Sequence, residues 1–514
     1  MVRAVIFDMD GVLIDTEKYL SKYWRQAAAE FGFSMSFEES LLLRSLTVPL
    51  AIEKTKEVFG ENFDYLKIRA RRKELMANWL SKHGVEKKPG IEAAFEDIKR
   101  RGMKLAVATA TDETRATSYL KEIGVYDKID YLLSTTMVKI GKPMPDIYLY
   151  ACECLGEKPE DCLAVEDSPN GIKSAFSAGI KAVMVPDLSE PEEELIPLLY
   201  GKIESLEQLP ALLDKEALES CTLCPRECKA DRAHGKKGVC GAVEGIVAAR
   251  AALHFWEEPC ISGEEGSGTV FFSGCPLHCV FCQNHDISDG KAGKEITIER
   301  LSEIFLELQE KGANNINLVT PTHYVLQIQR ALIRAKEQGL SIPVVYNCGG
   351  YEKPDTLRIL DGLVDIYLPD FKYMSEELGR RYSKAPDYAH FAKLSLAEMV
   401  RQVGEPVFDP QGRMKKGVIV RHLALPEQLE DSKAVLSYLY EAYGDNIFIS
   451  IMNQYTPMEN KKRYPELNRK LSEAEYEELV DYAISIGIEN GFIQEGETAL
   501  ESFIPAFDNE GIEN

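Results

Sequence analysis

The sequence has no run of about eighteen apolar residues, the length that a membrane-spanning helix requires. Its first residues lack the long apolar segment of a secretory signal peptide. Positive charge is scarce, because 60 lysines and arginines face 83 aspartates and glutamates, for a formal net charge of −23. Association with a phosphate backbone depends on clustered basic side chains. We therefore expect a cytoplasmic protein with no membrane anchor and no nucleic-acid partner.

The sequence also lacks the scattered arrangement of cysteines that is typical of a disulfide framework. The 12 cysteines stand largely in short groups, which in a reducing compartment favours metal or redox chemistry. The 514 residues are too many for one ordinary domain. A boundary between about Leu213 and Ser220 follows an acidic, proline-containing stretch. We therefore predict two domains, residues 1–214 and 215–514.

The first chemical motif is a pair of aspartates that directly follows an apolar segment. Residues 2–7 are expected to form a buried parallel strand, after which come Asp8 and Asp10. One carboxylate of such a pair can attack phosphorus while the other exchanges protons with the leaving oxygen. A second predicted strand ends in Thr109-Ala110-Thr111, whose hydroxyls suit a phosphate, and Lys142 offers a cation beside a loop. A third ends in Glu166-Asp167, an acidic pair that can complete a Mg²⁺ site.

These four motifs, in this order, resemble the haloacid dehalogenase (HAD) superfamily in its phosphatase and β-phosphoglucomutase-like branch, over about residues 1–214. The resemblance implies a Rossmann-like α/β core, a small phosphorylated metabolite as substrate and Mg²⁺ as cofactor. It implies Asp8 as nucleophile, Asp10 as general acid/base, and Thr109 and Lys142 as phosphate ligands. The implied Mg²⁺ ligands are Asp8, Asp167 and the Asp10 backbone carbonyl, with Glu166 close by.

A helical region is predicted between about residues 16 and 87, where apolar residues recur at three- and four-residue steps. By the same resemblance, this insertion is a cap that closes over the active site and sets specificity. Arg44 and Lys73 are candidates for contacting substrate, although a solvated surface position is the reading favoured for an isolated basic residue. Residues 43–46, Leu-Arg-Ser-Leu, replace the glycine-containing turn of the mutase-like enzymes. This favours a phosphatase over a phosphomutase.

Three cysteines with the spacing C-x3-C-x2-C organise the second half of the chain. Cys275, Cys279 and Cys282 follow directly on the apolar run 269–272. Three thiols packed this tightly leave an odd one and little room for disulfide geometry. They suit one iron–sulfur cluster, in which three thiolates leave one iron open for a substrate or cofactor. A structural zinc turn is the alternative, which zinc's preference for four protein ligands disfavours.

Strands and helices alternate from residue 269 onward, which predicts a parallel sheet, either open or curled into a barrel. The predicted strands are 269–272, 316–319, 344–347, 364–368, 418–421 and 447–451, and the predicted helices are 298–311, 324–337, 396–403 and 432–443. Polar residues follow all six strands. Because functional groups at the carboxyl ends of parallel strands build barrel active sites, these residues are expected to form one site.

The cysteine turn and these strands resemble the radical S-adenosylmethionine (SAM) superfamily and its partial (β/α)6 TIM barrel, over about residues 268–495. The motifs around the cysteines resemble more closely the pyruvate formate-lyase activating enzyme-like group. The resemblance implies that the three cysteines hold a [4Fe-4S] cluster whose open iron binds SAM, and that Phe281 packs near the adenine. It also implies an external electron donor such as flavodoxin or ferredoxin. Asn347, Asp370, Lys372 and Arg421 are candidates for SAM contacts by their position at strand ends. His323 is a candidate for a substrate or acid/base role, or for a structural hydrogen bond.

A second group of cysteines lies within residues 221–260. Cys221, Cys224 and Cys228 have the spacing C-x2-C-x3-C, and Cys240 follows after a basic, glycine-containing loop. This set can supply four ligands to zinc or to a second cluster, with Cys260 an equal candidate for the fourth ligand. Reduced structural thiols are the alternative.

The sequence therefore predicts a bifunctional enzyme, an Mg²⁺-dependent phosphatase joined to a radical SAM enzyme that produces a 5′-deoxyadenosyl radical. Two alternatives remain open. In one, the second half is an activase that installs a glycyl radical in a protein substrate. In the other, the first half is a phosphomutase or a regulatory module that binds a phosphorylated metabolite.

Overall fold

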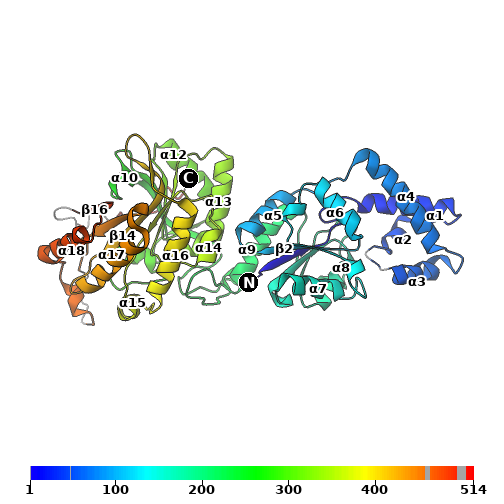
Figure 1. Ribbon diagram of the computed structural model, residues 1–514, viewed down its shortest axis with the longest axis horizontal. Coiled ribbons are helices and arrows are strands. Elements are labelled where there is room, and N and C mark those ends of the chain that lie inside the picture. The colour runs from blue at the N-terminus through cyan, green and yellow to red at the C-terminus, as the bar shows by residue number, and fades with distance from the viewer. Residues whose placement is uncertain (1, 45, 47, 458–462, 495–504, 514) are drawn as a thin grey trace. The chain divides into compact units, whose positions relative to one another are not determined.

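The structure is a computed structural model that describes residues 2–44, 46, 48–457, 463–494 and 505–513. The chain divides into two compact units, Met1–Glu216 and Ala217–Asn514. Among the described residues, no helix combines the length and the apolar character that crossing a membrane requires. Each unit has its own sheet (Figure 1). Each also has its own hydrophobic core.

A parallel sheet of six strands forms the centre of the first unit, in the order β3-β2-β1-β4-β5-β6. The strands are β1 (Ala4–Phe7), β2 (Lys104–Thr109), β3 (Tyr131–Ser134), β4 (Cys162–Glu166), β5 (Lys181–Met184) and β6 (Gly201–Lys202). All four residues of β1 are buried, as expected for a central strand covered on both faces. The strand order reverses between β1 and β4, and the crevice beyond their carboxyl ends is where open α/β sheets bind ligands.

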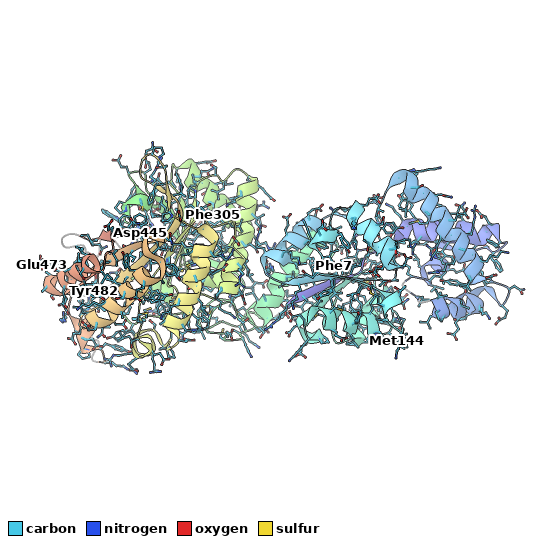
Figure 2. The ribbon with its side chains drawn as sticks, in the orientation of Figure 1. Phe7, Met144, Phe305, Asp445, Glu473 and Tyr482 are labelled. Carbon is cyan, nitrogen blue, oxygen red and sulfur yellow. The ribbon has the colours of Figure 1, made fainter. Side chains whose placement is uncertain are left out.

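Helices cover both faces of this sheet (Figure 1). One face packs against α5 (Ile91–Arg100), α6 (Glu113–Glu122) and α9 (Leu209–Glu219), and the other against α7 (Asp146–Leu155) and α8 (Pro169–Ser177). Phe7 at the end of β1 is fully buried, with its ring 5.1 Å from that of Phe95 on α5 (Figure 2). Burial of this kind holds the loop after β1 in a fixed position.

Four further helices form a separate small bundle between β1 and α5. They are α1 (Glu17–Glu30), α2 (Phe37–Leu41), α3 (Val48–Phe59) and α4 (Tyr65–His83). Their apolar faces share a core that includes Trp24, Phe63 and Ile68. α2 begins with a capping box, in which Ser36 and Glu39 each satisfy the other's backbone N–H.

Seven parallel strands form the main sheet of the second unit. They are β8 (Ser267–Phe272), β10 (Ile316–Val319), β11 (Val344–Cys348), β12 (Ile366–Pro369), β14 (Met414–Leu423), β15 (Phe448–Met452) and β16 (Gly491–Ile493). All six predicted strands are present and parallel, which confirms the predicted α/β class. The sheet also contains three antiparallel strands, β7 (Ile246–His254), β9 (Lys294–Ile296) and β13 (Val407–Phe408).

The helices of this unit lie mostly between the parallel strands. They are α10 (Pro259–Ser262), α11 (His285–Ser288), α12 (Ile298–Glu310), α13 (Val325–Glu337), α14 (Pro354–Arg358), α15 (Glu376–Ser383), α16 (Tyr388–Val403), α17 (Leu429–Tyr443) and α18 (Glu473–Ser485). Phe305 of α12 is fully buried in the core (Figure 2). α16 begins at Tyr388 rather than at the predicted Leu396, and the Tyr388 hydroxyl donates to the Gly349 carbonyl at 2.9 Å. This tertiary contact accompanies the longer helix.

Candidate active sites

Strand ends bring three buried carboxyl groups together in the first unit. Asp8 follows β1, and Glu166 and Asp167 stand at the end of β4. One oxygen of each lies within 4.8 Å of the other two. Carboxylate oxygens gathered in this way are the ligands that Mg²⁺ uses in proteins.

Two cations contact this carboxyl group cluster. Lys142 Nζ lies 2.5 Å from Asp8 Oδ1 and 2.5 Å from Glu166 Oε1, and Arg44 Nη1 lies 3.4 Å from Asp167 Oδ2. Burial raises the pKa of Asp8, and neighbouring carboxyl groups raise it further while Lys142 lowers it. Burial likewise raises the pKa of Asp167. A divalent cation would stabilise the ionised forms, so this donor set fits Mg²⁺.

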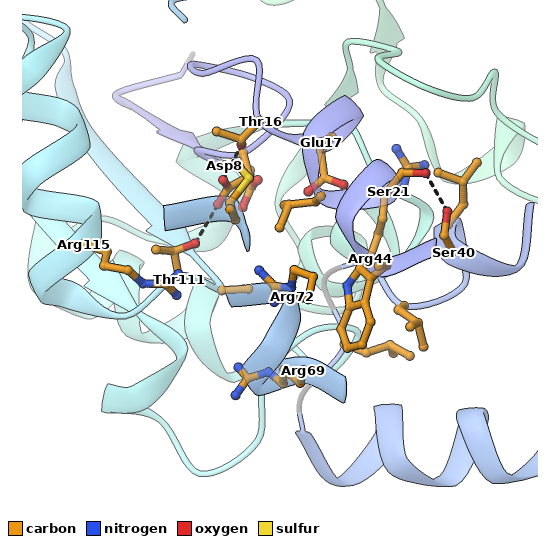
Figure 3. Close-up of a pocket in the computed structure, with 18 of the residues that line it drawn as sticks. Asp8, Thr16, Glu17, Ser21, Ser40, Arg44, Arg69, Arg72, Thr111 and Arg115 are labelled. Atoms are coloured by element: carbon orange, nitrogen blue, oxygen red, sulfur yellow. Dashed lines mark hydrogen bonds between the residues drawn. The ribbon is translucent and has the colours of Figure 1, made fainter. Parts of the chain in front are cut away.

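Asp10 is held by hydroxyl groups. Its Oδ1 accepts a hydrogen bond from Thr16 Oγ1 at 2.5 Å, and its Oδ2 accepts one from Thr111 Oγ1 at 2.8 Å (Figure 3). The same Oδ2 atom accepts a hydrogen bond from Thr109 Oγ1 at 3.5 Å. Thr109 also accepts the Thr111 backbone N–H at 3.0 Å. These bonds fix the orientation of the Asp10 carboxylate at the mouth of a pocket. Sequence reasoning assigned no role to Thr16, and it regarded Thr111 as a hydroxyl suited to a phosphate.

That pocket extends from Asp8 and Asp10 toward helices α1, α2 and α4, and its lining is rich in arginine (Figure 3). The arginines are Arg44, Arg69, Arg72 and Arg115. The favoured reading of Arg44 as a solvated surface charge is wrong, because this side chain is buried and contacts Asp167. Lys73 is half-buried, and the pocket lining does not include it.

Arg72 carries a buried charge in this pocket. Its guanidinium lies 5.2 Å from the Trp24 ring, and its Nε has no hydrogen-bond partner. Burial, together with Arg69 and Arg115, lowers its pKa to about 10. A buried cation without a close carboxylate is costly, and an anionic ligand would offset that cost.

Two glycines leave room for the carboxyl groups. A Cβ on Gly11, whose φ is +85°, would lie 2.3 Å from Asp167 Oδ2. A Cβ on Gly171 would lie 2.0 Å from the Glu166 Cδ atom. Any larger residue at either position would displace a carboxyl group of the cluster.

In the second unit, the three cysteines of the C-x3-C-x2-C turn line one cavity. Cys275, Cys279 and Cys282 are half-buried and lie between β8 and α11. The Leu277 backbone N–H donates to Cys275 Sγ at 3.4 Å, and Cys279 Sγ lies 3.0 Å from Ser383 Oγ. Burial raises the pKa of Cys275 to about 12 and that of Cys282 to about 11. Thiolates at these positions therefore need a bound cation, which an iron–sulfur cluster supplies.

The strand-end candidates Asn347, Asp370, Lys372 and Arg421 line the same cavity and form one network. Lys372 Nζ lies 2.6 Å from Asp370 Oδ2, and Arg421 Nε lies 3.1 Å from Asp370 Oδ1. Arg421 Nη2 donates to Asn347 Oδ1 at 2.6 Å. Desolvation raises the pKa of half-buried Asp370, but the charges of Lys372 and Arg421 hold it below its usual value. The network thus offers both charges to a zwitterionic ligand.

Phe281 lies beside the cysteines, buried in a cage of tyrosines. Its ring makes edge contacts with Tyr373, Tyr382 and Tyr455, at centroid distances of 6.4, 6.2 and 6.5 Å. It also lines the cavity, which suits contact with an aromatic ligand.

Glu257 is a site residue that sequence reasoning missed. It accepts hydrogen bonds from Asn317 at 2.9 Å and Asn347 at 3.3 Å, and Arg421 Nη1 lies 3.1 Å from its other oxygen. Its only signal in the sequence was its place in the Glu-Glu-Pro-Cys motif. His323, by contrast, is buried, and its Nε2 donates to the Ser273 carbonyl at 2.8 Å. Burial lowers the pKa of His323 to about 3, which fits the structural reading.

The second cysteine group is also drawn together. Cys221, Cys224, Cys228 and Cys240 lie near one another in the segment before β7. Cys260 instead packs on α10 among Ile261, Val345 and Ile366. Of the two candidates for a fourth ligand, the structure groups Cys240 with the others.

Two family models match this chain. Residues 2–179 match haloacid dehalogenase-like hydrolases, and residues 269–410 match the radical SAM superfamily. A "Phosphorylated carbohydrates phosphatase" of Thermotoga maritima is 31% identical over 228 residues, which cover 42% of this chain and 93% of that protein. A "Putative phosphatase YhcW" of Bacillus subtilis is 30% identical over 188 residues, covering 36% and 84%.

A third relative is an "Uncharacterized protein MJ0674" of Methanocaldococcus jannaschii. It is 30% identical over 289 residues, which cover 53% of this chain and 79% of that protein. These matches confirm the two families that the motifs indicated. The first unit belongs to the haloacid dehalogenase-like hydrolases and the second to the radical SAM superfamily, so the chain is a hydrolase fused to a radical SAM enzyme.

Proposed function

We propose that the first unit is an Mg²⁺-dependent phosphatase that acts on a small phosphorylated metabolite. The observation that carries this proposal is the buried cluster of Asp8, Glu166 and Asp167 with Lys142. The name of the Thermotoga maritima relative favours a phosphorylated carbohydrate as the substrate class. The arginine-lined pocket supports a strongly anionic substrate.

In this proposal, Asp8 attacks the phosphorus atom and forms an aspartyl phosphate as the bond to the leaving oxygen breaks. Asp10, oriented by Thr16 and Thr111, gives its proton to that oxygen. Asp10 then takes a proton from the water that hydrolyses the aspartyl phosphate. Lys142 and Thr109 bind phosphoryl oxygens, and Glu166 holds Lys142 in place. Asp8, Asp167 and the Asp10 carbonyl would hold Mg²⁺, which would supply positive charge against the phosphate.

Asp8→Asn tests this assignment. We expect hydrolysis of a generic phosphate ester to fall at least ~10³-fold, because an amide cannot serve as the nucleophile. Asp15→Asn is the matched control, since Asp15 lies in the same loop but pairs with Lys18 and Lys88. Chelation should remove activity and Mg²⁺ should restore it. An unchanged rate of hydrolysis in Asp8→Asn would refute the assignment of Asp8 as the nucleophile.

We further propose that the second unit cleaves SAM at a [4Fe-4S] cluster held by Cys275, Cys279 and Cys282. The supporting observation is that these thiols share one cavity with the network around Arg421. The three thiolates would hold the cluster, which would supply the one electron that cleaves SAM to methionine and a 5′-deoxyadenosyl radical. Lys372, Asp370, Asn347 and Arg421 bind the polar groups of SAM. Phe281 packs against the adenine and keeps water away from that end of the cavity.

Anaerobic reconstitution followed by reduction tests this second activity. The wild-type chain should produce 5′-deoxyadenosine from SAM with flavodoxin, ferredoxin or a chemical reductant as the electron donor. Cys279→Ala should abolish the product, while Cys260→Ser should keep it, because Cys260 lies outside the cavity. Product formation in Cys279→Ala at the wild-type rate would overturn the assignment.

The alternatives differ in substrate rather than in these residues. A glycyl-radical activase would share the SAM chemistry but take its hydrogen atom from a protein backbone, so radical transfer to a partner protein would identify it. A phosphomutase would convert a sugar phosphate to its isomer without releasing phosphate. Ser45, in the turn that favoured a phosphatase, lies outside the described residues.

A further inference from the structure

Four thiols lie together in the segment 220–245, apart from the three that share the SAM cavity. Cys221, Cys224 and Cys240 are buried, and Cys228 is half-buried. Cys240 interacts electrostatically with Cys221 and Cys228, and Cys224 interacts with Cys221 and Cys240. The four cysteines are therefore neighbours in the structure.

The segment that carries these thiols has little regular structure. Between the end of α9 at Glu219 and the start of β7 at Ile246, the one element is the short 3-10 turn Arg232–His234. Because the segment lacks the backbone hydrogen bonds of a helix or a sheet, other bonds must fix its conformation. Coordination of a metal centre by its side chains can do so. Backbone N–H groups of Arg226 and Ala242 interact with the Cys224 and Cys240 sulfurs. In the first set, the Leu277 backbone N–H likewise donates a hydrogen bond to the Cys275 sulfur.

Gly238 keeps the space between two of the sulfurs open. A Cβ at this position would lie 3.2 Å from Cys240 Sγ and 3.6 Å from Cys228 Sγ. Arg232 closes the other side, with Nη1 3.6 Å from Cys221 Sγ. The thiols therefore surround a space that a larger side chain would enter.

Arg232 shows that this space suits an anionic group. Its side chain is 1% exposed, and it donates to the carbonyls of Val243 and His323 and to the Cys221 sulfur. Within the described part of the chain, it forms no ion pair with a carboxylate. A buried guanidinium without a counter-charge is unfavourable. Four thiolates around a metal centre carry a net negative charge and would supply it.

The separation of the sulfurs distinguishes a cluster from a single ion. In tetrahedral zinc sites the Zn–S distance of about 2.3 Å places the sulfurs about 3.8 Å apart. Within the described ranges, Asp8, Glu166 and Asp167 are the one group of three such ligand atoms that lie within 4.8 Å of one another. Neither cysteine set meets that limit, and in a cluster each thiolate binds a different iron. In each set, at least one pair of sulfurs is therefore more than 4.8 Å apart, which is wider than the spacing in a tetrahedral zinc site.

We propose that Cys221, Cys224, Cys228 and Cys240 bind a second iron–sulfur cluster. Because all four of its ligands are thiolates, this cluster has no iron open to SAM. It fixes the segment that contacts the SAM-binding turn, where the Cys240 carbonyl accepts the Cys275 N–H at 3.1 Å. The proposal concerns ligands other than those of the first cluster, so each can fail without the other.

Iron analysis of a chain that lacks the first cluster tests the proposal. After anaerobic reconstitution with iron and sulfide, the Cys275→Ala/Cys279→Ala/Cys282→Ala variant should retain about four irons per chain, against about eight in the wild type. Adding Cys224→Ala should remove the remaining iron, whereas adding Cys260→Ser should not. Absence of iron in the triple variant, or stoichiometric zinc in its place, would overturn the second cluster.

Electron paramagnetic resonance of the reduced wild-type protein gives a check that needs no substitution. Two cluster signals are expected, and SAM should change only one of them. If the multiple variants do not fold, this measurement still decides the question. A single signal that accounts for all the iron and shifts with SAM would refute the proposal.

Discussion

At the scale of single residues, the sequence revealed some members of each site and not others. Asp8, Asp10, Glu166 and Asp167 stood out because each follows an apolar strand, and the fold brings those strand ends together. Glu257 and Gly171 could not be found in this way. The role of Glu257 depends on Arg421, which is distant in the sequence. That of Gly171 depends on how closely the Glu166 carboxyl group approaches its backbone.

Replacing Arg72 should weaken substrate binding. Arg72→Met removes a buried cation from the pocket, so we expect KM for an anionic phosphate ester to rise by about tenfold or more, with a smaller change in kcat. Lys73→Met is the matched control, because this neighbouring cation on α4 lies outside the pocket lining. Equal effects of the two substitutions on steady-state kinetics would contradict a specific role for Arg72.

A buried carboxyl group in the second unit should make stability depend on pH. Burial raises the pKa of Glu352 from 4.5 to about 8, although Thr322 and Tyr346 donate hydrogen bonds to it. Below pH 4.5 the Glu352 carboxyl group is protonated in both the folded and the unfolded chain, so its contribution to the free energy of unfolding is fully present. As the pH rises toward about 8, only the folded chain holds the proton. The free energy of unfolding should therefore fall by up to about 1.4 kcal/mol per pH unit in this window.

Glu352→Gln should remove this slope from the free energy of unfolding, measured by urea unfolding at several pH values. Glu377→Gln is the control, since Glu377 is exposed on α15. An unchanged pH dependence in Glu352→Gln would show that another group carries the titration.

At the scale of elements, the sequence predicted the alternation of helices and parallel strands, but it did not predict several of the strands. β16 is only three residues long, and β7 is rich in alanine, which strands disfavour. Both are fixed by pairing, β7 with β8 and β16 with β15. The antiparallel edge of the sheet was therefore absent from the sequence prediction, whereas the strands that carry the site were present.

One arginine in the segment before β7 binds the backbone of the turn that carries Cys275, Cys279 and Cys282. Arg226 donates to the carbonyls of Pro276 at 2.8 Å and Ser383 at 2.7 Å, and also to that of Lys384. Arg226→Lys cannot span these acceptors, because an ammonium group lacks the planar fork of a guanidinium. We expect faster loss of cluster iron to a chelator, by severalfold, with the SAM cleavage rate falling in parallel. Arg358→Lys, on exposed α14, should match the wild type.

At the scale of the whole molecule, helix α9 decides where the chain can be divided. Its Leu209 and Leu213 are buried in the core of the first unit, whereas Ala217 and Leu218 belong to the core of the second. Composition placed the boundary nearby, but only the packing shows that both cores use one helix.

A fragment that ends at Glu219 should retain phosphatase activity, while one that ends at Gln208 should not. The shorter fragment exposes core around two missing leucines, each worth about 1.5–3 kcal/mol of burial. It also loses Glu216, whose carboxylate accepts the Val2 backbone N–H at 3.0 Å and pairs with Lys181 at 2.6 Å. Activity and thermal unfolding of the two fragments check this. Equal stability would show that α9 is dispensable to the first unit.

The bond between Val2 and Glu216 means that the first unit begins and ends at the same place. A short linker could therefore join residue 216 to residue 2, and new termini could be opened in a loop elsewhere. Such a circular permutant would keep every strand pairing of the sheet. The first unit could then be inserted at different positions of a synthetic protein as an independent domain.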